Sequence, residues 1–251
     1  MENSGLLEYY KKRVKPHKST LNEFMNKVFS VSKELDIDPL WLLATMDSES
    51  GLDSTKQNTG HPVNNGYATG LIQFIPSTAG RVLHGKSYDA KADAKNGFKI
   101  GREATDKLKV MSSVEQMDYV KKYFDPYVSR LNSYVDLYMT TFFPLALGMS
   151  DSFVLETKNI PAGKLASANP IFDSNKDHKV TVGEIKLAFM DRVPSEFREE
   201  FKKGMGIVSE MVTETKRFAK RNWIPISLTV VSLIGLTWVV IKYNSKTTIS
   251  I

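Results

Sequence analysis

The apolar residues near the start of the chain are spaced three or four apart, as they are on one face of a helix. They are Leu21, Phe24, Met25, Val28, Val31 and Leu35. Thr20 and Glu23 have the spacing of a capping box at the start of this helix. Asp38 and Pro39 predict the start of a second helix, with Asp as N-cap and Pro in the first position. Residues 40–46 are apolar nearly all round, which indicates that this second helix is buried.

Turn-rich and helical segments alternate farther along the chain. Residues 53–69 are rich in Gly, Pro and Asn and predict a loop, and Pro76 predicts the start of another helix. Further charged segments with helical character are 89–110, 113–123 and 127–139. No run of alternating polar and apolar residues is long enough for a sheet, so we predict a mainly α fold.

The most apolar segment comes near the end of the chain, where residues 223–241 carry no charge. At a rise of ~1.5 Å per residue, this segment nearly spans a hydrocarbon core of ~30 Å. Lysine and arginine flank both ends, as they do in membrane-spanning helices. We therefore predict a C-terminal transmembrane helix at 223–243, the alternative being a buried core helix.

These patterns divide the chain of 251 residues into consecutive parts. They are an N-terminal arm (1–17), a helical domain (18–150), an extension (151–194), a charged helical stalk (195–222), the transmembrane helix (223–243) and a tail (244–251). The absence of cysteine excludes disulfides, thiolate metal sites and cysteine nucleophiles. The net charge of +6 is suited to binding an anionic lipid or an anionic wall polymer. The alternative is that the lysines only keep the outer faces of helices solvated. No nucleic-acid-binding motif accompanies this charge, so we expect no nucleic-acid partner.

Glu49 lies where the predicted buried helix meets the turn-rich loop. A carboxyl group half withdrawn from water there is expected to have a raised pKa, because desolvation disfavours its charged form. A raised pKa is what a general acid needs to protonate a glycosidic oxygen near neutral pH. From residue types alone, a glutamate at a helix end is more often a surface residue, so the surrounding sequence has to decide.

Two segments around this glutamate carry a more specific pattern. Residues 46–58 read MDSESGLDSTKQN, and residues 66–80 read GYATGLIQFIPSTAG. The Glu-Ser pair after an apolar helix, followed about twenty residues later by Gly-Leu-Ile-Gln-Phe, resembles the lysozyme-like lytic transglycosylases, a superfamily shared with goose-type lysozyme. The resemblance covers roughly residues 20–147, about half of the chain, and implies a lysozyme-like helical domain.

The resemblance implies that Glu49 is the single catalytic acid/base of a peptidoglycan lytic transglycosylase that needs no cofactor for catalysis. In the family this glutamic acid protonates the oxygen between N-acetylmuramic acid and N-acetylglucosamine. As a carboxylate it then removes the proton of the muramyl 6-hydroxyl, which gives a 1,6-anhydro product. Ser50 and Gln73 are expected to donate hydrogen bonds in the cleft, and Gly70 to let the backbone approach the substrate. Further residues expected to line the cleft are Asn58 and Thr69.

The sequence departs from the family in one motif and raises a question of mechanism. The Ala-Tyr-Asn motif of many members is absent, and residues 137–144 (LYMTTFFP) take about its place, as in phage members. Tyr138 in this segment either serves in the cleft or is a core tyrosine on a helix. The usual glycosidase routes need two carboxylates at a fixed distance. Asp47 and Asp53 are the nearest acids, and neither is placed to share the face of Glu49, which favours the transglycosylase reaction and leaves hydrolysis as the alternative.

Residues 173–184 match the spacing of a twelve-residue calcium loop of the EF-hand type. The expected ligands are Asp173, Asn175, Asp177, Lys179 through its carbonyl, Thr181 and Glu184. His178 replaces the usual glycine at position six, which weakens the motif without excluding it, because histidine tolerates left-handed backbone angles better than most residues. We expect either a structural calcium site or an Asp/Asn-rich surface turn.

The expected location follows from the predicted span and from the charge around it. Residues 1–16 have no apolar core of a secretory signal, and the cations before the span mildly favour a cytoplasmic enzyme domain. Peptidoglycan lies on the other side of the membrane, so a cytoplasmic enzyme domain would not reach it. An enzyme carried in the internal membrane of a phage virion can reach the wall during infection. We therefore expect a virion-associated enzyme that opens the wall during infection or release, with the host inner membrane as the alternative location. The expected partners are peptidoglycan glycan strands, membrane lipid through 223–243 and other virion proteins. The alternative function is a non-catalytic lysozyme-like structural or membrane adaptor protein of the virion.

Overall fold

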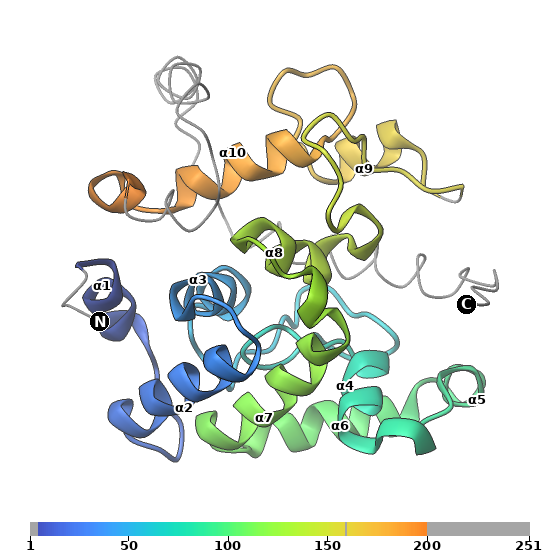
Figure 1. The fold of residues 1–251 in the computed structure, drawn as a ribbon. Coiled ribbons are helices and arrows are strands. Elements are labelled where there is room, and N and C mark those ends of the chain that lie inside the picture. The colour runs from blue at the N-terminus through green and yellow to red at the C-terminus, as the bar shows by residue number, and fades with distance from the viewer. Residues whose placement is uncertain (1–4, 159, 200–251) are drawn as a thin grey trace.

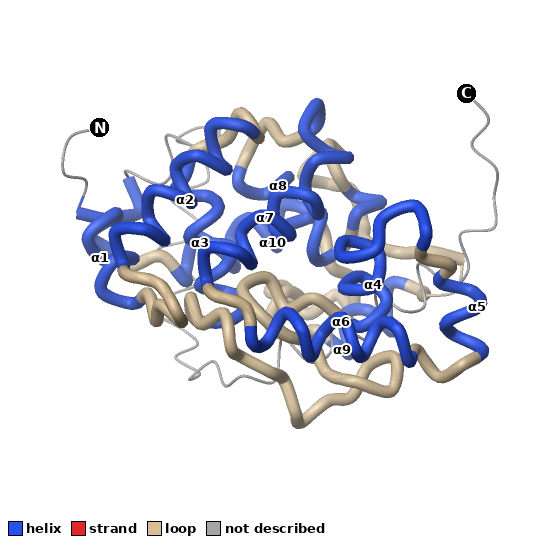
Figure 2. Tube along the Cα trace, turned by 90° about the horizontal axis from the view of Figure 1, so that it is seen from below, coloured by secondary structure: helices blue, strands red, loops and turns tan. Residues whose placement is uncertain are grey.

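A computed structural model describes residues 5–158 and 160–199 of the chain. Its α-helices are α1 (Gly5–Arg13), α2 (Leu21–Glu34), α3 (Pro39–Ser50), α4 (Pro76–His84), α5 (Ala90–Lys95), α6 (Lys99–Val110), α7 (Ser113–Phe124), α8 (Tyr134–Phe142), α9 (Ala162–Ala168) and α10 (Val182–Arg192). Short 3-10 helices are η1 (Gly85–Ser87), η2 (Asp125–Arg130), η3 (Pro144–Ala146) and η4 (Ser195–Phe197). Figure 2 shows helices and loops without a strand in the described part, which confirms the mainly α prediction.

The predicted helix starts are present with their hydrogen bonds. Thr20 and Glu23 form a capping box at the start of α2, because each side chain accepts a hydrogen bond from the backbone N–H of the other. Asp38 caps α3 by accepting a hydrogen bond from the N–H of Leu40, with Pro39 in the first turn. These caps explain why the first two predicted helices begin where the sequence places them.

Helix α3 is enclosed by several other helices. It packs against α1, α2 and α8, while α2 also packs against α7, and α4 packs along α6 (Figure 1). Five consecutive residues of α3, 42–46, are buried, as the apolar run predicts. The carboxyl end of this buried helix is where Glu49 lies, so the whole bundle holds that position.

The extension after residue 150 shares the core of the helical domain. In Figure 1, α9 and α10 lie on the side of α8 that faces away from α2 and α7. The ring of Phe189 in α10 lies 5.7 Å from that of Tyr134 and 3.8 Å from that of Tyr138, both in α8. The buried apolar residues of both parts form one cluster, which runs from Leu6 to Val193. The extension is therefore joined to the helical domain by aromatic packing across α8.

Two predicted segments differ in the structure. The predicted N-terminal arm contains helix α1, whose Leu6, Leu7 and Tyr10 are buried against the core. The predicted helix at 127–139 is instead η2 followed by α8, and Pro126 in the first turn of η2 marks the change from α7. Both segments contain apolar residues. Their pattern did not show that residues 1–17 pack against the core, nor at which residue the helix after Pro126 begins.

The end of the described chain returns to its beginning. The ring of Phe197 in η4 lies 6.1 Å from that of Tyr9 in α1, and a Cβ on Gly5 would come within 2.6 Å of Phe197.

No helix within residues 5–158 and 160–199 is long and apolar enough to cross a membrane. The transmembrane helix predicted at 223–243, the tail and most of the predicted stalk lie outside the described residues.

Candidate active site

The candidate site is built around Glu49, in the last turn of α3. Its side chain is only 6% exposed, although it belongs to the charged residues that seldom lie inside a fold. Helix α3 ends one residue later, because Gly51 adopts a left-handed conformation (φ +68°) as its C-cap. The glutamate is therefore enclosed at the end of a helix rather than displayed on its surface.

Ser50 joins this helix end to the loop that carries the second family motif. Its hydroxyl oxygen lies 2.9 Å from the carbonyl oxygen of Met46 and 3.0 Å from that of Leu71. The hydroxyl group has a single proton, so the two carbonyl oxygens share one hydrogen-bond donor. The Ser50 side chain is buried. The prediction assigned Ser50 to the substrate, but in the structure its hydroxyl binds the backbone of loop 70–74.

Loop 70–74 is a tight turn closed by its own backbone. Thr69 and Phe74 exchange both backbone hydrogen bonds, at 3.0 and 2.8 Å, and the Gln73 side chain donates to the carbonyls of Gly70 and Lys56. Gly70 and Gln73 both have positive φ, at +85° and +50°. The sequence Gly-Leu-Ile-Gln-Phe therefore specifies a rigid turn beside the end of α3.

Gln116, a residue of α7 that the sequence did not single out, fastens this turn to the core. Its Oε1 accepts a hydrogen bond from the N–H of Leu71 at 2.6 Å, and its Nε2 donates to the carbonyls of Ser54 and Leu108 at 2.9 Å each. A Cβ on Gly70 would lie 2.4 Å from the same Oε1. The space beside Gly70 is thus filled by Gln116, whereas the sequence predicted an approach of substrate there.

The two further cleft candidates lie on the loop before this turn. Thr69 is fully buried, with its hydroxyl donating to the carbonyl of Tyr67 and accepting from Gln57. Asn58 is half-buried, and its backbone N–H binds the carbonyl of Ala68. The contacts of Thr69 are those of a residue that shapes the loop.

The acids nearest in sequence to Glu49 are bound elsewhere. Asp47 receives hydrogen bonds from Arg13 of α1, at 2.9 Å from Nε and 2.8 Å from Nη2. Asp53 accepts from the backbone and hydroxyl of Thr55. Because α3 ends at Ser50, Asp53 is not on the helix, which confirms that neither acid shares the helix face of Glu49.

Tyr123 of α7 packs against loop 70–74, the loop that Ser50 joins to the end of α3. Its hydroxyl donates to the carbonyl of Thr140, and its ring packs edge-on against Phe74. Burial raises the pKa of Tyr123 well above its usual value, and the negative charge of Glu49 adds to the rise, while Arg81 opposes it. Tyr123 therefore connects the glutamate to a groove on the adjoining surface.

That groove runs between α4 and the end of α7 and has a volume of about 490 Å³. It is lined by Thr78, Arg81, Val82, Gly85, Lys86, Lys122, Tyr123, Pro126 and Tyr127. The first four recur at helical spacing on and just after α4, and the two tyrosines are four residues apart. We refer to it below as the α4–α7 groove.

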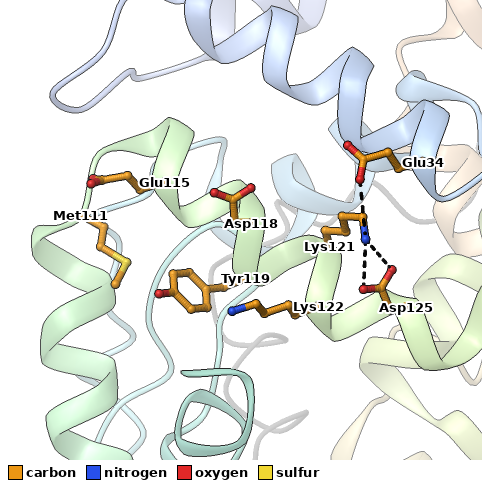
Figure 3. A pocket seen from close by; sticks show the side chains of 8 residues that line it. All are labelled: Glu34, Met111, Glu115, Asp118, Tyr119, Lys121, Lys122 and Asp125. Atoms are coloured by element: carbon orange, nitrogen blue, oxygen red, sulfur yellow. Dashed lines mark hydrogen bonds and ion pairs between the residues drawn. The ribbon is translucent and has the colours of Figure 1, made fainter. Parts of the chain in front are cut away.

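A second hollow, of about 540 Å³, lies on the surface between α2 and α7 (Figure 3). Its charges are already paired, since Lys121 contacts Glu34 and Asp125, at 3.6 and 3.0 Å. Asp118, another lining residue, pairs with Lys27. A surface of paired ions offers little to a ligand, so this hollow is not our candidate site.

Tyr138 does not reach either hollow. It is fully buried, and its ring stacks on Phe142 and lies against Phe189. The structure thus places Tyr138 in the core, the second of the two alternatives that the sequence left open.

The sequence contained signals for two of the residues that were missed. Gln116, Val120 and Tyr123 are four and three residues apart, so all three lie on the core face of α7. A lone glutamine on such an apolar face has to satisfy its carboxamide inside the protein. Arg81 carried no comparable signal, because one cation on an amphipathic helix is normally a solvated residue.

The loop at 173–184 has part of the shape that a calcium loop requires. His178, at position six, has φ +63°, the left-handed conformation for which glycine is normally used. Its N–H donates to Oδ2 of Asp173, while Oδ1 of Asp173 is buried without a hydrogen-bond partner. The helix before the loop, α9, is only seven residues long, and α10 follows the loop.

The last expected ligand of this loop makes other contacts. Glu184 completes a capping box with Thr181 at the start of α10 through Oε2, and its Oε1 accepts from Ser174. Within the described part of the chain, no group of three or more His, Cys, Asp or Glu side chains is close enough together to hold a metal ion.

The chain was also compared with known proteins. Comparison with protein-family models, with curated proteins and with solved structures finds no match in any of the three. The candidate site therefore stands on its own residues and geometry.

We predict that Gly70→Ala lowers the free energy of unfolding by roughly 2–4 kcal/mol, because it adds a strained φ and a clash with the Gln116 carboxamide. Denaturant unfolding of the full-length protein measures the loss. Gly148→Ala is the matched control, since Gly148 also has positive φ (+75°) but open space around a Cβ. Equal losses in both variants would contradict the role given to Gln116.

Proposed function

We propose that this protein is a peptidoglycan lytic transglycosylase that cleaves the β-1,4 bond between N-acetylmuramic acid and N-acetylglucosamine, with Glu49 as its only catalytic acid/base. The observation that carries the proposal is the enclosure of Glu49 at the end of α3, beside loop 70–74 and beside Tyr123. The resemblance of both segments to the lysozyme-like enzymes supports it independently, as does the mainly α fold.

In the proposed reaction Glu49 first acts as an acid. It donates its proton to the glycosidic oxygen as the bond to the muramyl C1 breaks, so that the N-acetylglucosamine side leaves as an alcohol. A carboxyl group withdrawn from water is suited to this step, because burial favours the neutral form. The resulting carboxylate takes the proton of the muramyl 6-hydroxyl, whose oxygen forms the new bond to C1. The product is a 1,6-anhydro sugar, and the acid is regenerated.

A single carboxylate suffices for this sequence of steps, whereas hydrolysis by the usual routes needs a second one. The two sequence neighbours, Asp47 and Asp53, are engaged by Arg13 and Thr55. The α4–α7 groove has no acidic residue among the described residues that line it. This distribution of carboxylates favours the transglycosylase over the hydrolase.

We predict that Glu49→Gln lowers the rate of peptidoglycan cleavage by about 10²–10⁴-fold, because the amide cannot transfer a proton. Mass spectrometry of the released muropeptides measures the loss and identifies the products, which are expected to carry 1,6-anhydro ends. The controls are Asp47→Asn and Asp53→Asn, which should retain most of the activity.

Three results would count against this assignment. Products with hydrolysed reducing ends and no anhydro sugar would contradict the transglycosylase reaction. Loss of activity in Asp53→Asn equal to that in Glu49→Gln would indicate a second catalytic carboxylate. A Glu49→Gln protein that cleaves as fast as the wild type would favour a structural lysozyme-like domain.

We also propose that loop 173–184 binds calcium and so stiffens the extension against α8. Asp173, Asn175, Asp177, Thr181 and Glu184 would supply side-chain oxygens, and Lys179 its carbonyl. The left-handed backbone at His178 and the buried, unsatisfied Oδ1 of Asp173 support the fit. The role is structural, and no catalytic step passes through the ion.

We expect calcium to bind the full-length protein with a Kd between about 10⁻⁶ and 10⁻³ M and to raise its unfolding temperature. Isothermal calorimetry measures the binding, and Asp173→Asn should abolish it. Glu156→Gln, an exposed acid of the same extension, is the control that should leave it intact. No heat at millimolar calcium would refute the site.

The proposed location rests on the sequence outside the described residues. Residues 223–243 anchor the protein in a membrane, with the internal membrane of a phage virion preferred over the host inner membrane. We predict that the full-length protein floats with lipid vesicles in a density gradient and that truncation after residue 222 leaves it at the bottom. If both proteins float, residues 223–243 are not the membrane anchor. If the protein is absent from purified phage particles, the proposed location in the virion is wrong.

A further inference from the structure

The α4–α7 groove differs in charge from the hollow between α2 and α7. Arg81, Lys86 and Lys122 contribute three cations to it, and none of its described lining residues is acidic. In the hollow between α2 and α7, Lys121 by contrast lies between two carboxylates (Figure 3). Of these two hollows, the α4–α7 groove is therefore the one with an excess of positive charge.

Two of these cations have no anionic partner within the described chain. Arg81 and Lys86 are exposed, and the side chain of neither makes a hydrogen bond or ion pair among the described residues. Lys122 lies over the ring of Tyr119, at 4.7 Å from its centroid, which neutralises no charge. Unpaired cations in a concave surface attract anions more strongly than the same charges on a flat one.

Arg81 lines the α4–α7 groove together with Tyr123 and Tyr127. Its positive charge opposes the rise that burial causes in the pKa of both tyrosines. Arginine can bind a carboxylate with two parallel hydrogen bonds, and a partly buried tyrosine offers a flat face to a sugar or peptide group. The groove thus combines a carboxylate binder with a surface for the neutral part of the same ligand.

The position of the groove relative to Glu49 identifies the anion. Tyr123 lines the groove, and its ring packs edge-on against Phe74 of loop 70–74, which Ser50 fastens to the end of α3 next to Glu49. A glycan strand with its scissile bond at Glu49 carries a peptide stem on its muramyl residue, and the stem bears carboxylates. The nearest part of the substrate that is both anionic and off the glycan backbone is this stem.

We propose that the α4–α7 groove binds the carboxylates of the peptide stem through Arg81 and Lys86, so that the protein prefers glycan strands with free stem carboxylates over strands with amidated stems. This inference rests on the proposed function, since it takes peptidoglycan as the substrate. It assigns the groove a role in selecting among peptidoglycans of different stem chemistry. Arg81 and Lys86 act on binding, and the acid/base chemistry remains with Glu49.

The test is a binding measurement with two ligands of equal size. The full-length Glu49→Gln protein, in mild detergent, is titrated by calorimetry with a tetrasaccharide of alternating N-acetylglucosamine and N-acetylmuramic acid that carries peptide stems with free carboxylates. The second ligand is the same compound with the stem carboxylates converted to primary amides. We expect the free-carboxylate ligand to bind at least tenfold more tightly, and the preference to shrink as salt is raised.

Variants then assign the preference to the groove. Adding Arg81→Gln and Lys86→Gln should reduce the ratio of the two affinities to near one. Lys33→Gln, an exposed lysine of α2 outside the groove, should leave the ratio unchanged. A ratio that is near one from the start, or that survives the double substitution, would overturn the inference.

A parallel assay separates this result from the fate of the proposed function. Protein with Glu49 intact is incubated with peptidoglycan, and the released anhydro products are measured. Cleavage without a stem preference refutes the inference alone. If the protein neither binds these ligands nor cleaves peptidoglycan, the proposed function is refuted, and the inference is refuted with it.

Discussion

A carboxamide enclosed in an apolar core has to find partners for its oxygen and its nitrogen, because leaving either unsatisfied costs about 1–3 kcal/mol. Gln116 meets this requirement by binding the N–H of Leu71 and the carbonyls of Ser54 and Leu108. Three separate stretches of backbone are thereby held at fixed distances from α7. The Ser50 hydroxyl donates to the carbonyl of Leu71, whose N–H binds Gln116, so the end of α3 is fixed to the same residue of the loop. The precise placement of Glu49 depends on this buried amide.

Helix α7 serves two purposes through one face. Gln116 near its start fixes loop 70–74, and Tyr123 near its end packs against Phe74 of that loop and lines the α4–α7 groove. The two residues are two turns apart on the same side of the helix. A shift of α7 along its axis would therefore move the loop and the wall of the groove together. The glutamate, the turn and the groove form one mechanical unit, although they come from distant parts of the sequence.

The sequence predicted the helices and the position of the glutamate better than the contacts of the site. Local rules placed the starts of α2 and α3, because capping is decided by residues three apart, as with Thr20 and Glu23. The sequence predicted that Glu49, at the end of the apolar run, is half withdrawn from water, and the structure encloses it more fully. The roles of Ser50 and Gly70 did not, because each is defined by a partner that lies far away along the chain: Leu71 for the first and Gln116 for the second. Tyr138 and Tyr123 could not be told apart by sequence, since a tyrosine in an apolar helix suits a core and a cleft equally.

The contact between η4 and α1 gives the domain a defined point of attachment. Phe197 packs against Gly5 and Tyr9, so the last element of the described chain lies beside α1. Helix α1 is joined to the end of α3 through Arg13 and Asp47. The end of the described chain is thereby linked through α1 to the turn of α3 that carries Glu49, while the residues of α4 and α7 that line the α4–α7 groove take no part in this link.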